Sequence, residues 1–205
     1  MTTTTSTLPT YGYPSVMGNE AGFSMEHSDV HHQFGDDAVT VGSRGEKIIA
    51  QLLNKWVPSD AVIFPSVKIP GAEADIDFLI VRGNRVLLVD AKYFKSGTIY
   101  HSNAANPDYM YENGVQTHRM SHSMDMAVNR LRSLLPGHVV SGVVILAPHH
   151  KFSDVSNLVW PGGFSTFYGD EAIPVVRGFL ARATGGHQAA YPAACVAMSL
   201  AFRNR

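Results

Sequence analysis

Three charged residues stand beside apolar segments in the first half of the chain. Asp77 precedes the apolar run 78–81, and the run 86–89 is followed by Asp90 and Lys92 in a D-x-K arrangement. Carboxylate oxygens are the ligands that hard divalent cations such as Mg²⁺ and Mn²⁺ prefer. A neighbouring lysine can neutralise part of the carboxylate charge, so these residues are the first candidates for a site.

A short turn predicts how these residues face one another. The dipeptide Gly83-Asn84 separates two β-rich segments, residues 74–81 and 85–94, and such a dipeptide favours a two-residue hairpin turn. Arg82 then lies opposite Arg85, and this pair sets the register for the rest of the hairpin.

Counting back along both strands places Asp77 directly opposite Asp90 and Asp75 opposite Lys92. Because side chains alternate along a strand, Glu73 joins these four residues on one face. A turn of three residues would shift this pairing by one position.

Directly opposed carboxylates repel each other, and the repulsion grows beside an apolar run where water is scarce. A divalent cation held by Asp77 and Asp90 would offset it, with the carbonyl of Ala91 as a third protein ligand and water completing the shell. The alternative is an ordinary hairpin whose acidic end splays into solvent, with Asp90 and Lys92 as a surface ion pair.

Other segments supply the elements that must position these residues. Helical spacing of apolar residues predicts a helix from Gly42 to Trp56, ended by Pro58. Residues 62–69 and the apolar run 139–147 are predicted strands. Weaker patterns predict a strand near 165–168 and a short helix over 173–183.

Between these segments we predict a polar loop over residues 101–114 and a second helix over 116–135. This helix has an apolar stripe that should pack on the sheet. The stripe consists of Met120, Met124, Ala127, Val128, Leu131, Leu134 and Leu135.

The composition fits one globular domain. With 205 residues, 45% hydrophobic residues and a single cysteine, the chain has room for a sizeable core and forms no internal disulfide. We predict a flexible leader over 1–40, the domain over 41–183 and an apolar extension of unknown role over 184–205. Without a recognisable secretion signal or a bilayer-spanning segment, a cytoplasmic location without membrane contact is expected.

The formal net charge of −1 gives no overall positive field that would attract nucleic acid. A protein of this composition that binds nucleic acid therefore needs a local basic rim.

The order of three motifs resembles the nuclease-related domain (NERD) family of the PD-(D/E)xK, restriction-endonuclease-like superfamily. The motifs are G-x-x-G-E over residues 42–46, the segment DIDFLIV over 75–81, and VLLVDAKY over 86–93. The resemblance covers roughly residues 41–150. It implies an α/β fold with a mixed β-sheet flanked by helices, forming a restriction-endonuclease-like core.

The resemblance also implies roles for individual residues. Asp77 and Asp90 would hold Mg²⁺ or Mn²⁺, Lys92 would position or activate water, and Glu46 would complete the catalytic set directly or through a metal-bound water. Glu46 has a simpler explanation as well, because a glutamate in the first turn of a helix interacts favourably with the helix dipole.

Five further residues are candidate contacts to substrate. Arg82, Lys95 and Tyr93 lie near the motif in sequence, as does Arg85. Relatives in the superfamily place a glutamine near the start of the second helix, which suggests Gln116; a hydrogen bond at the helix start would explain this residue equally well.

The histidines do not form a predicted metal site. His118 and His122 are spaced four residues apart, but the predicted helix directs both to its polar face, away from the acidic hairpin. His149 and His150 follow a strand and could approach the mouth of the site, with no pattern to fix their direction.

The resulting hypothesis is a Mg²⁺- or Mn²⁺-dependent nuclease that acts on nucleic acid, with DNA favoured over RNA by the resemblance alone. Two alternatives remain open. The chain could be a catalytically silent nucleic-acid- or protein-binding module, or a regulatory partner that binds through the polar face around His118.

Overall fold

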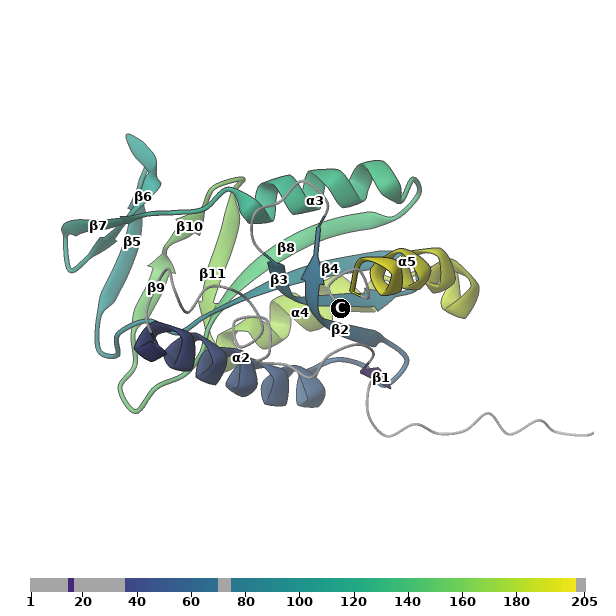
Figure 1. The fold of residues 1–205 in the computed structure, drawn as a ribbon, viewed down its shortest axis with the longest axis horizontal. Helices are drawn as coiled ribbons and strands as arrows, with labels where there is room; N and C mark the ends of the chain where they lie inside the picture. The colour runs from purple at the N-terminus through teal and green to yellow at the C-terminus, as the bar shows by residue number, and fades with distance from the viewer. Residues whose placement is uncertain (1–14, 17–35, 70–74, 202–205) are drawn as a thin grey trace, which may run out of the picture.

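The computed structural model describes residues 15–16, 36–69 and 75–201. Two β-sheets with helices around them form one α/β domain (Figure 1). The predicted fold class, a mixed sheet flanked by helices, is confirmed. Most of the predicted leader, and Glu73, lie outside the described residues.

The larger sheet has seven strands in the order β1-β2-β3-β4-β8-β11-β10. Strands β2, β3 and β4 form an antiparallel meander, whereas β4, β8 and β11 run parallel. The strand bounds are β1 Ser15–Val16, β2 Val62–Lys68, β3 Asp75–Arg82, β4 Arg85–Lys92, β8 Val139–Leu146, β10 Val159–Trp160 and β11 Phe164–Tyr168. The predictions for β2, β3, β4, β8 and β11 are correct to within about two residues at each end.

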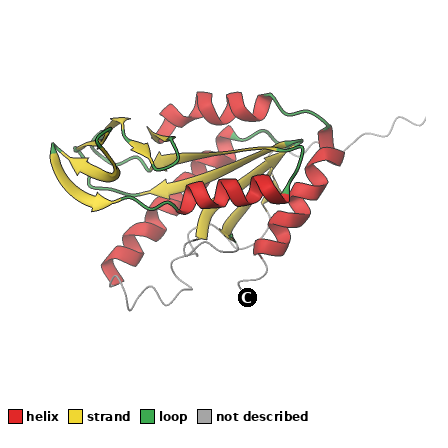
Figure 2. Ribbon diagram, turned by 90° about the horizontal axis from the view of Figure 1, so that it is seen from above, coloured by secondary structure: helices red, strands yellow, loops and turns green. Residues whose placement is uncertain are grey.

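Helices cover both faces of this sheet (Figure 2). One apolar core contains residues of α2 (Asp36–Trp56) and α4 (Ile173–Ala181), and the other contains residues of α3 (Ser123–Leu134) and α5 (Gly186–Ala201). A 3₁₀ turn, η1 (Gly169–Ala172), leads from β11 into α4. Strands β4 and β8 are buried on both faces, which explains their continuous apolar sequences.

The predicted loop over residues 101–114 is wrong. This region forms a second sheet in the order β7-β6-β5-β9, which protrudes beyond one end of the main sheet (Figure 1). Its strands are β5 Ile99–Asn103, β6 Asn106–Glu112, β7 Val115–Arg119 and β9 Asp154–Asn157. All residues of β7 are exposed, so β7 lacks the alternation of apolar and polar residues by which a half-buried strand is recognised.

The second helix begins at Ser123 rather than at the predicted residue 116, because residues 115–119 belong to β7. Most of its predicted apolar stripe is buried, although Leu134 is exposed and Met120 precedes the helix. His118 and His122 therefore do not share a helical face. Their Nε2 atoms lie near different carboxylates, 3.6 Å from Glu112 for His118 and 3.1 Å from Asp108 for His122.

Two predicted boundaries also change. Helix α2 begins at Asp36 and thus extends into the stretch assigned to the leader, while its end at Trp56 is confirmed. The C-terminal segment forms α5, whose Ala193, Ala197 and Leu200 are buried in the core that also contains residues of α3. None of the helices in the described part of the chain is long and apolar enough to cross a membrane.

The two-residue turn and its register are confirmed. Arg82 pairs with Arg85, and the ladder continues to the pair of Phe78 and Val89. Gly83 has a φ of 51°, and the carbonyl oxygen of Thr184 would lie 2.5 Å from a Cβ at this position. The turn therefore requires glycine for both its backbone conformation and its packing.

Gly83→Ala should lower the free energy of unfolding by about 1–3 kcal/mol, because it forces alanine into a left-handed conformation and against the Thr184 carbonyl. Urea unfolding measures this loss. Gly178→Ala is the matched control: Gly178 lies in α4 with open space where a Cβ would stand, so alanine should stabilise the protein slightly. Equal stability of the two variants would contradict the role given to the turn.

Candidate functional site

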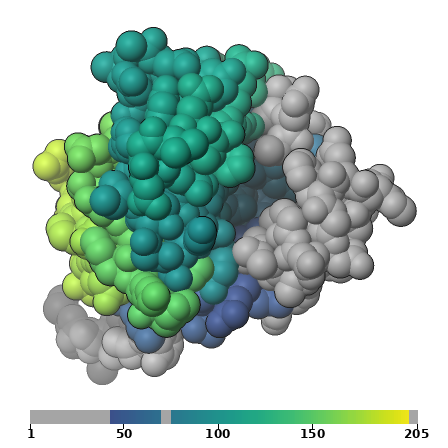
Figure 3. Space-filling view, turned by 90° about the vertical axis from the view of Figure 1, so that its left-hand side faces the viewer, coloured from purple at the N-terminus to yellow at the C-terminus, as the bar shows by residue number. Residues whose placement is uncertain are grey.

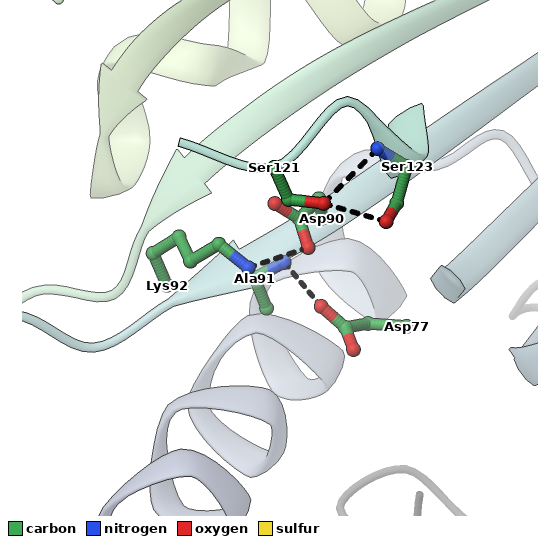
Figure 4. Close-up of polar contacts among 6 residues, drawn as sticks. All are labelled: Asp77, Asp90, Ala91, Lys92, Ser121 and Ser123. Atoms are coloured by element: carbon green, nitrogen blue, oxygen red, sulfur yellow. Dashed lines mark hydrogen bonds and ion pairs between the residues drawn. The ribbon is translucent and has the colours of Figure 1, made fainter. Parts of the chain in front are cut away.

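The two opposed aspartates lie where β3 separates from β4. The last ladder pair before them is Phe78 and Val89, and Asp77 and Asp90 occupy the next position in the same register. There the Ala91 amide donates a 2.6 Å hydrogen bond to Oδ2 of Asp77 (Figure 4). The Ala91 amide of β4 therefore bonds to the Asp77 carboxylate instead of to a backbone carbonyl of β3. This bond holds β3 and β4 close together where their backbone pairing has ended.

The pairing of β3 with its other neighbour, β2, is also interrupted at Asp77. The pairing of β2 with β3 skips Ser66 and Asp77, which lie between the pairs Pro65–Phe78 and Val67–Ile76. Ser66 is buried, with a φ of 52° that is rare for a residue other than glycine.

This irregularity reverses the alternation of side chains along β3. Phe78 packs in the core beneath α2 and α4, whereas Ile76 packs in the core beneath α3 and α5. Asp77 lies at the changeover, which is why its carboxylate reaches the edge of β4. The Oγ atom of Ser66 has no hydrogen-bond partner within the described part of the chain.

Lys92 is held between a carboxylate and an aromatic ring. Its Nζ atom lies 2.8 Å from Oδ1 of Asp90, and this Asp90 side chain is only 14% exposed (Figure 4). The same ammonium group lies 5.9 Å from the ring centroid of Trp160 in β10, which is within the range of cation–π attraction. The alternative interpretation predicted this Asp90–Lys92 ion pair, and the pair is present, but it is partly buried rather than fully exposed at the surface.

Glu46 brings a third carboxylate from α2. It is only 4% exposed, on the flank of the helix that also buries Ile49 and Leu53. Its negative charge acts on both Asp77 and Lys92. The structure therefore brings together all four residues that sequence analysis named as catalytic candidates.

Burial and mutual repulsion change the acid–base behaviour of this cluster. Burial raises the pKa of Asp77 well above its ordinary value, and the negative charges of Asp90 and Glu46 raise it further. Burial alone would lower the pKa of Lys92, but Asp90, Asp77 and Glu46 outweigh it and raise that pKa. The ammonium group thus stays charged, while Asp77 resists losing its proton.

Asp77, Asp90 and the Ala91 carbonyl are the groups that could hold a divalent cation. The amide and carbonyl of one strand residue point to the same side, so the Ala91 carbonyl faces β3, as its amide does. Across the described residues, no group of three or more His, Cys, Asp or Glu side chains forms a ready-made metal site. The donors present suit Mg²⁺, which usually takes one or two carboxylates and keeps several waters.

Tyr93 and Lys95 extend from the end of β4 and line one pocket together with Arg44, His149 and His150. Gly45, the second glycine of the G-x-x-G-E motif, explains why this end of β4 lies so close to α2. A Cβ on Gly45 would lie 2.7 Å from the Cβ of Tyr93, so the contact requires a residue without a side chain.

Other predicted substrate contacts are not brought to the cluster. Arg82 lies at the turn end of β3, five residues or about 16 Å from Asp77, and binds Asp60 and the Leu180 carbonyl. Arg85, at the same end, donates to the Arg182 carbonyl. Both side chains hold the turn against the C-terminal end of α4.

Two more predictions need correction. Gln116 does not begin a helix; it is exposed on β7, where its side chain accepts a hydrogen bond from the Tyr111 hydroxyl. Asp75 pairs with Lys68 of β2 rather than lying in a ladder position opposite Lys92, because β3 has already separated from β4.

Four residues near the cluster or its pocket were given no site role from the sequence: Ser66, Trp160, Arg44 and His149, of which only His149 was noted as able to approach the mouth of the site. Arg44 lies inside the G-x-x-G-E motif, so its position in that motif could have indicated that it lies near the site. The other three come from β2, β10 and the segment after β8. Only the three-dimensional arrangement of the sheet brings them here.

Asp77→Asn should make the stability of the metal-free protein less dependent on pH. The wild type loses stability as pH rises from the ordinary aspartate pKa of 3.8 through the raised pKa of folded Asp77, because the folded state must then accept a buried charge. Asparagine removes this loss and still accepts from the Ala91 amide. At high pH we expect a melting temperature about 2–4 °C above wild type.

Thermal unfolding in EDTA across a pH series measures this effect. Asp60→Asn is the control, since Asp60 is exposed and pairs only with Arg82 among the contacts described. Its curve should follow that of the wild type or lie slightly below it. A variant Asp77→Asn that is less stable at every pH would contradict the repulsion between the carboxylates.

Comparison with known families agrees with this geometry. The profile of the nuclease-related domain matches residues 41–147, just over half of the chain, from α2 to the end of β8. Neither curated proteins nor solved structures give a match. The matched region contains Glu46, Asp77, Asp90 and Lys92, and the chain belongs to the nuclease-related domain (NERD) family of the restriction-endonuclease-like superfamily.

Proposed function

We propose that this protein is a Mg²⁺- or Mn²⁺-dependent nuclease that hydrolyses phosphodiester bonds, with DNA as its substrate. The observation that carries the proposal is the position of Asp77 and Asp90, which face each other at the end of a confirmed hairpin register with Lys92 beside them. Membership of the NERD family supports the reaction class. The preference for DNA over RNA rests on the resemblance to the superfamily.

In this proposal Asp77 and Asp90 hold the cation together with the Ala91 carbonyl. Their repulsion in a poorly solvated position favours a positively charged ligand. When bound, the cation polarises the scissile phosphate and lowers the pKa of a bound water.

Lys92 acts as a charged donor. Because its pKa is raised, the ammonium group is protonated near neutral pH and cannot take a proton from water in the metal-free state. It can instead orient the attacking water through a hydrogen bond and stabilise negative charge that develops on the phosphate. The bond to Asp90 and the ring of Trp160 fix its position for this role.

Glu46 is placed to complete the site from the side of α2. Its charge acts on Asp77 and Lys92, so it adds to the negative potential that attracts a cation. Its carboxylate can also accept a hydrogen bond from water in the coordination shell of the cation.

Purified wild-type protein should degrade plasmid or single-stranded DNA in the presence of Mn²⁺ and lose this activity in EDTA. Asp90→Ala and Lys92→Ala should reduce the cleavage rate by at least about 100-fold, because each removes a group that acts on the reacting phosphate. Gel-based cleavage rates measure the effect.

Arg130→Gln, on the exposed surface of α3, controls for purification and folding and should cleave at the wild-type rate. Equal degradation by the wild type, Asp90→Ala and Lys92→Ala would identify a contaminating nuclease. That result would favour the alternative of a catalytically silent binding module.

Calorimetry provides an independent test of the cation site. Mn²⁺ must displace a proton from Asp77, so its apparent affinity should rise with pH by up to about tenfold per unit until the raised pKa of Asp77 is passed. Asp77→Asn should abolish binding. Mn²⁺ affinity that is independent of pH and unaffected in Asp77→Asn would place the cation elsewhere.

A further inference from the structure

A pocket of about 500 Å³ lies next to the carboxylate cluster, and its walls come from three parts of the chain. Arg44 and Ile48 belong to α2, residues 93–96 follow β4, and residues 148–150 follow β8. Lys95 is three residues beyond Lys92, so the two Cα atoms are at most about 11 Å apart. The pocket lining therefore adjoins the cluster along the chain, at Tyr93 directly after Lys92 and at Arg44 two residues before Glu46.

The same end of the molecule faces the viewer in Figure 3. Blue atoms of α2 and green atoms of the chain that follows β8 reach the surface at its lower edge, below the second sheet. Arg44 and His150, which belong to these two segments, line the pocket.

Contacts between rings and a guanidinium group organise the pocket wall. The ring of His149 lies 3.9 Å from that of Tyr93, and the Arg44 guanidinium group lies 5.7 Å from the centroid of the same ring. An arginine held over an aromatic ring loses less freedom when it binds a ligand.

The backbone around the pocket is also fixed. The Tyr168 hydroxyl accepts a 2.8 Å hydrogen bond from the His149 amide and lies 3.1 Å from the Lys151 carbonyl. On the other wall, the Lys95 carbonyl accepts from the Tyr100 hydroxyl at 2.9 Å. The pocket is therefore formed before any ligand arrives.

The charge of the pocket selects an anion. Its described lining contains Arg44, Lys95 and two histidines and no carboxylate. Burial lowers the pKa of His149, and the neighbouring His150 and Arg44 lower it further, while a hydrogen bond to the Phe94 backbone opposes the shift. The ring thus lies in a positive field, which a negatively charged ligand would reduce.

The rest of the lining indicates more than a bare anion. Ile48, Tyr93, Phe94 and Pro148 provide apolar and aromatic walls, and 500 Å³ falls within the roughly 300–1,000 Å³ of small-molecule sites. Cationic groups beside aromatic and apolar surface are the features by which proteins bind the phosphate and the base of an unpaired nucleotide.

We infer that this pocket binds one unpaired nucleotide of the substrate strand, adjacent to the bond that is cleaved. Arg44 and Lys95 contact its phosphate, and the apolar walls hold its sugar and base. The placement next to the cleaved bond rests on the proposed function, whereas the affinity of the pocket for a nucleotide is measured without cleavage. The site also supplies the local basic rim that the overall charge of the chain lacks.

Fluorescence anisotropy of the full chain with a labelled, short single-stranded oligodeoxyadenylate in EDTA tests the inference. Arg44→Gln and His149→Ala should each weaken binding about tenfold. The first removes a charged contact to the phosphate, and the second removes the ring that packs on Tyr93. Arg130→Gln removes the same charge from the surface of α3 and should bind as the wild type does. Lys95→Gln provides a further variant if either pocket variant fails to fold.

Competition defines the ligand. Deoxyadenosine 5′-monophosphate should displace the oligonucleotide at concentrations at least about tenfold below those needed for inorganic phosphate or deoxyadenosine. Inorganic phosphate that competes equally well would reduce the pocket to a bare anion site and overturn the inference. Equal weakening by Arg44→Gln and Arg130→Gln would also overturn it.

The two proposals can fail separately. Nucleotide binding that depends on Arg44 and His149, without Mn²⁺-dependent cleavage, would leave the pocket in place and remove the nuclease activity. Cleavage whose KM does not change in the pocket variants would retain the nuclease and reject the pocket.

Discussion

Three carboxylates and one ammonium group share the poorly solvated space where β3 separates from β4. Burial and like charge oppose the ionisation of Asp77, and Lys92 together with the Ala91 amide counters only part of that effect. A metal-free chain can relieve the repulsion by retaining a proton. Under the proposed function the same arrangement would favour a bound divalent cation, so a feature that is unfavourable in the metal-free protein would become useful once the cation binds.

The fold must keep these charges together despite their repulsion. It does so with strands β4 and β8, which are buried on both faces, and with α2, which carries Glu46 against them. The hairpin turn at Gly83 lies at the far end of β3 and β4, where Arg82 and Arg85 bind backbone carbonyls near the end of α4. Backbone pairing near the turn fixes the register of the two strands. At the opposite end of the hairpin, Asp77 and Asp90 lie beyond the last backbone pair.

Sequence patterns predicted the part of the molecule that rests on local rules. The Gly83-Asn84 turn and the alternation of side chains were enough to place Asp77 opposite Asp90. The second sheet escaped prediction because β7 is exposed and shows no apolar alternation. Met120 lies in the core just ahead of α3, and its helical spacing from Met124 extended the predicted helix beyond its true start.

The finer geometry of the site could not be predicted, for a different reason. The skipped pair at Ser66 and Asp77 reverses the alternation on which the face assignments depended, and Ser66 is not a residue type that signals a left-handed backbone. Trp160 and His149 reach the site from strands or segments that are distant in sequence. Such contacts follow from the order of strands in the sheet, which the local pattern does not contain.

Gly45 has a consequence for how far this site can vary. Gly45 leaves no room for a Cβ against Tyr93, so the missing side chain sets the spacing between α2 and the end of β4. Glu46 is attached to one of these elements and Lys92 to the other. Even one methyl group at position 45 would push α2 away from the end of β4 and widen the gap between Glu46 and Lys92, although it would leave every charged residue unchanged.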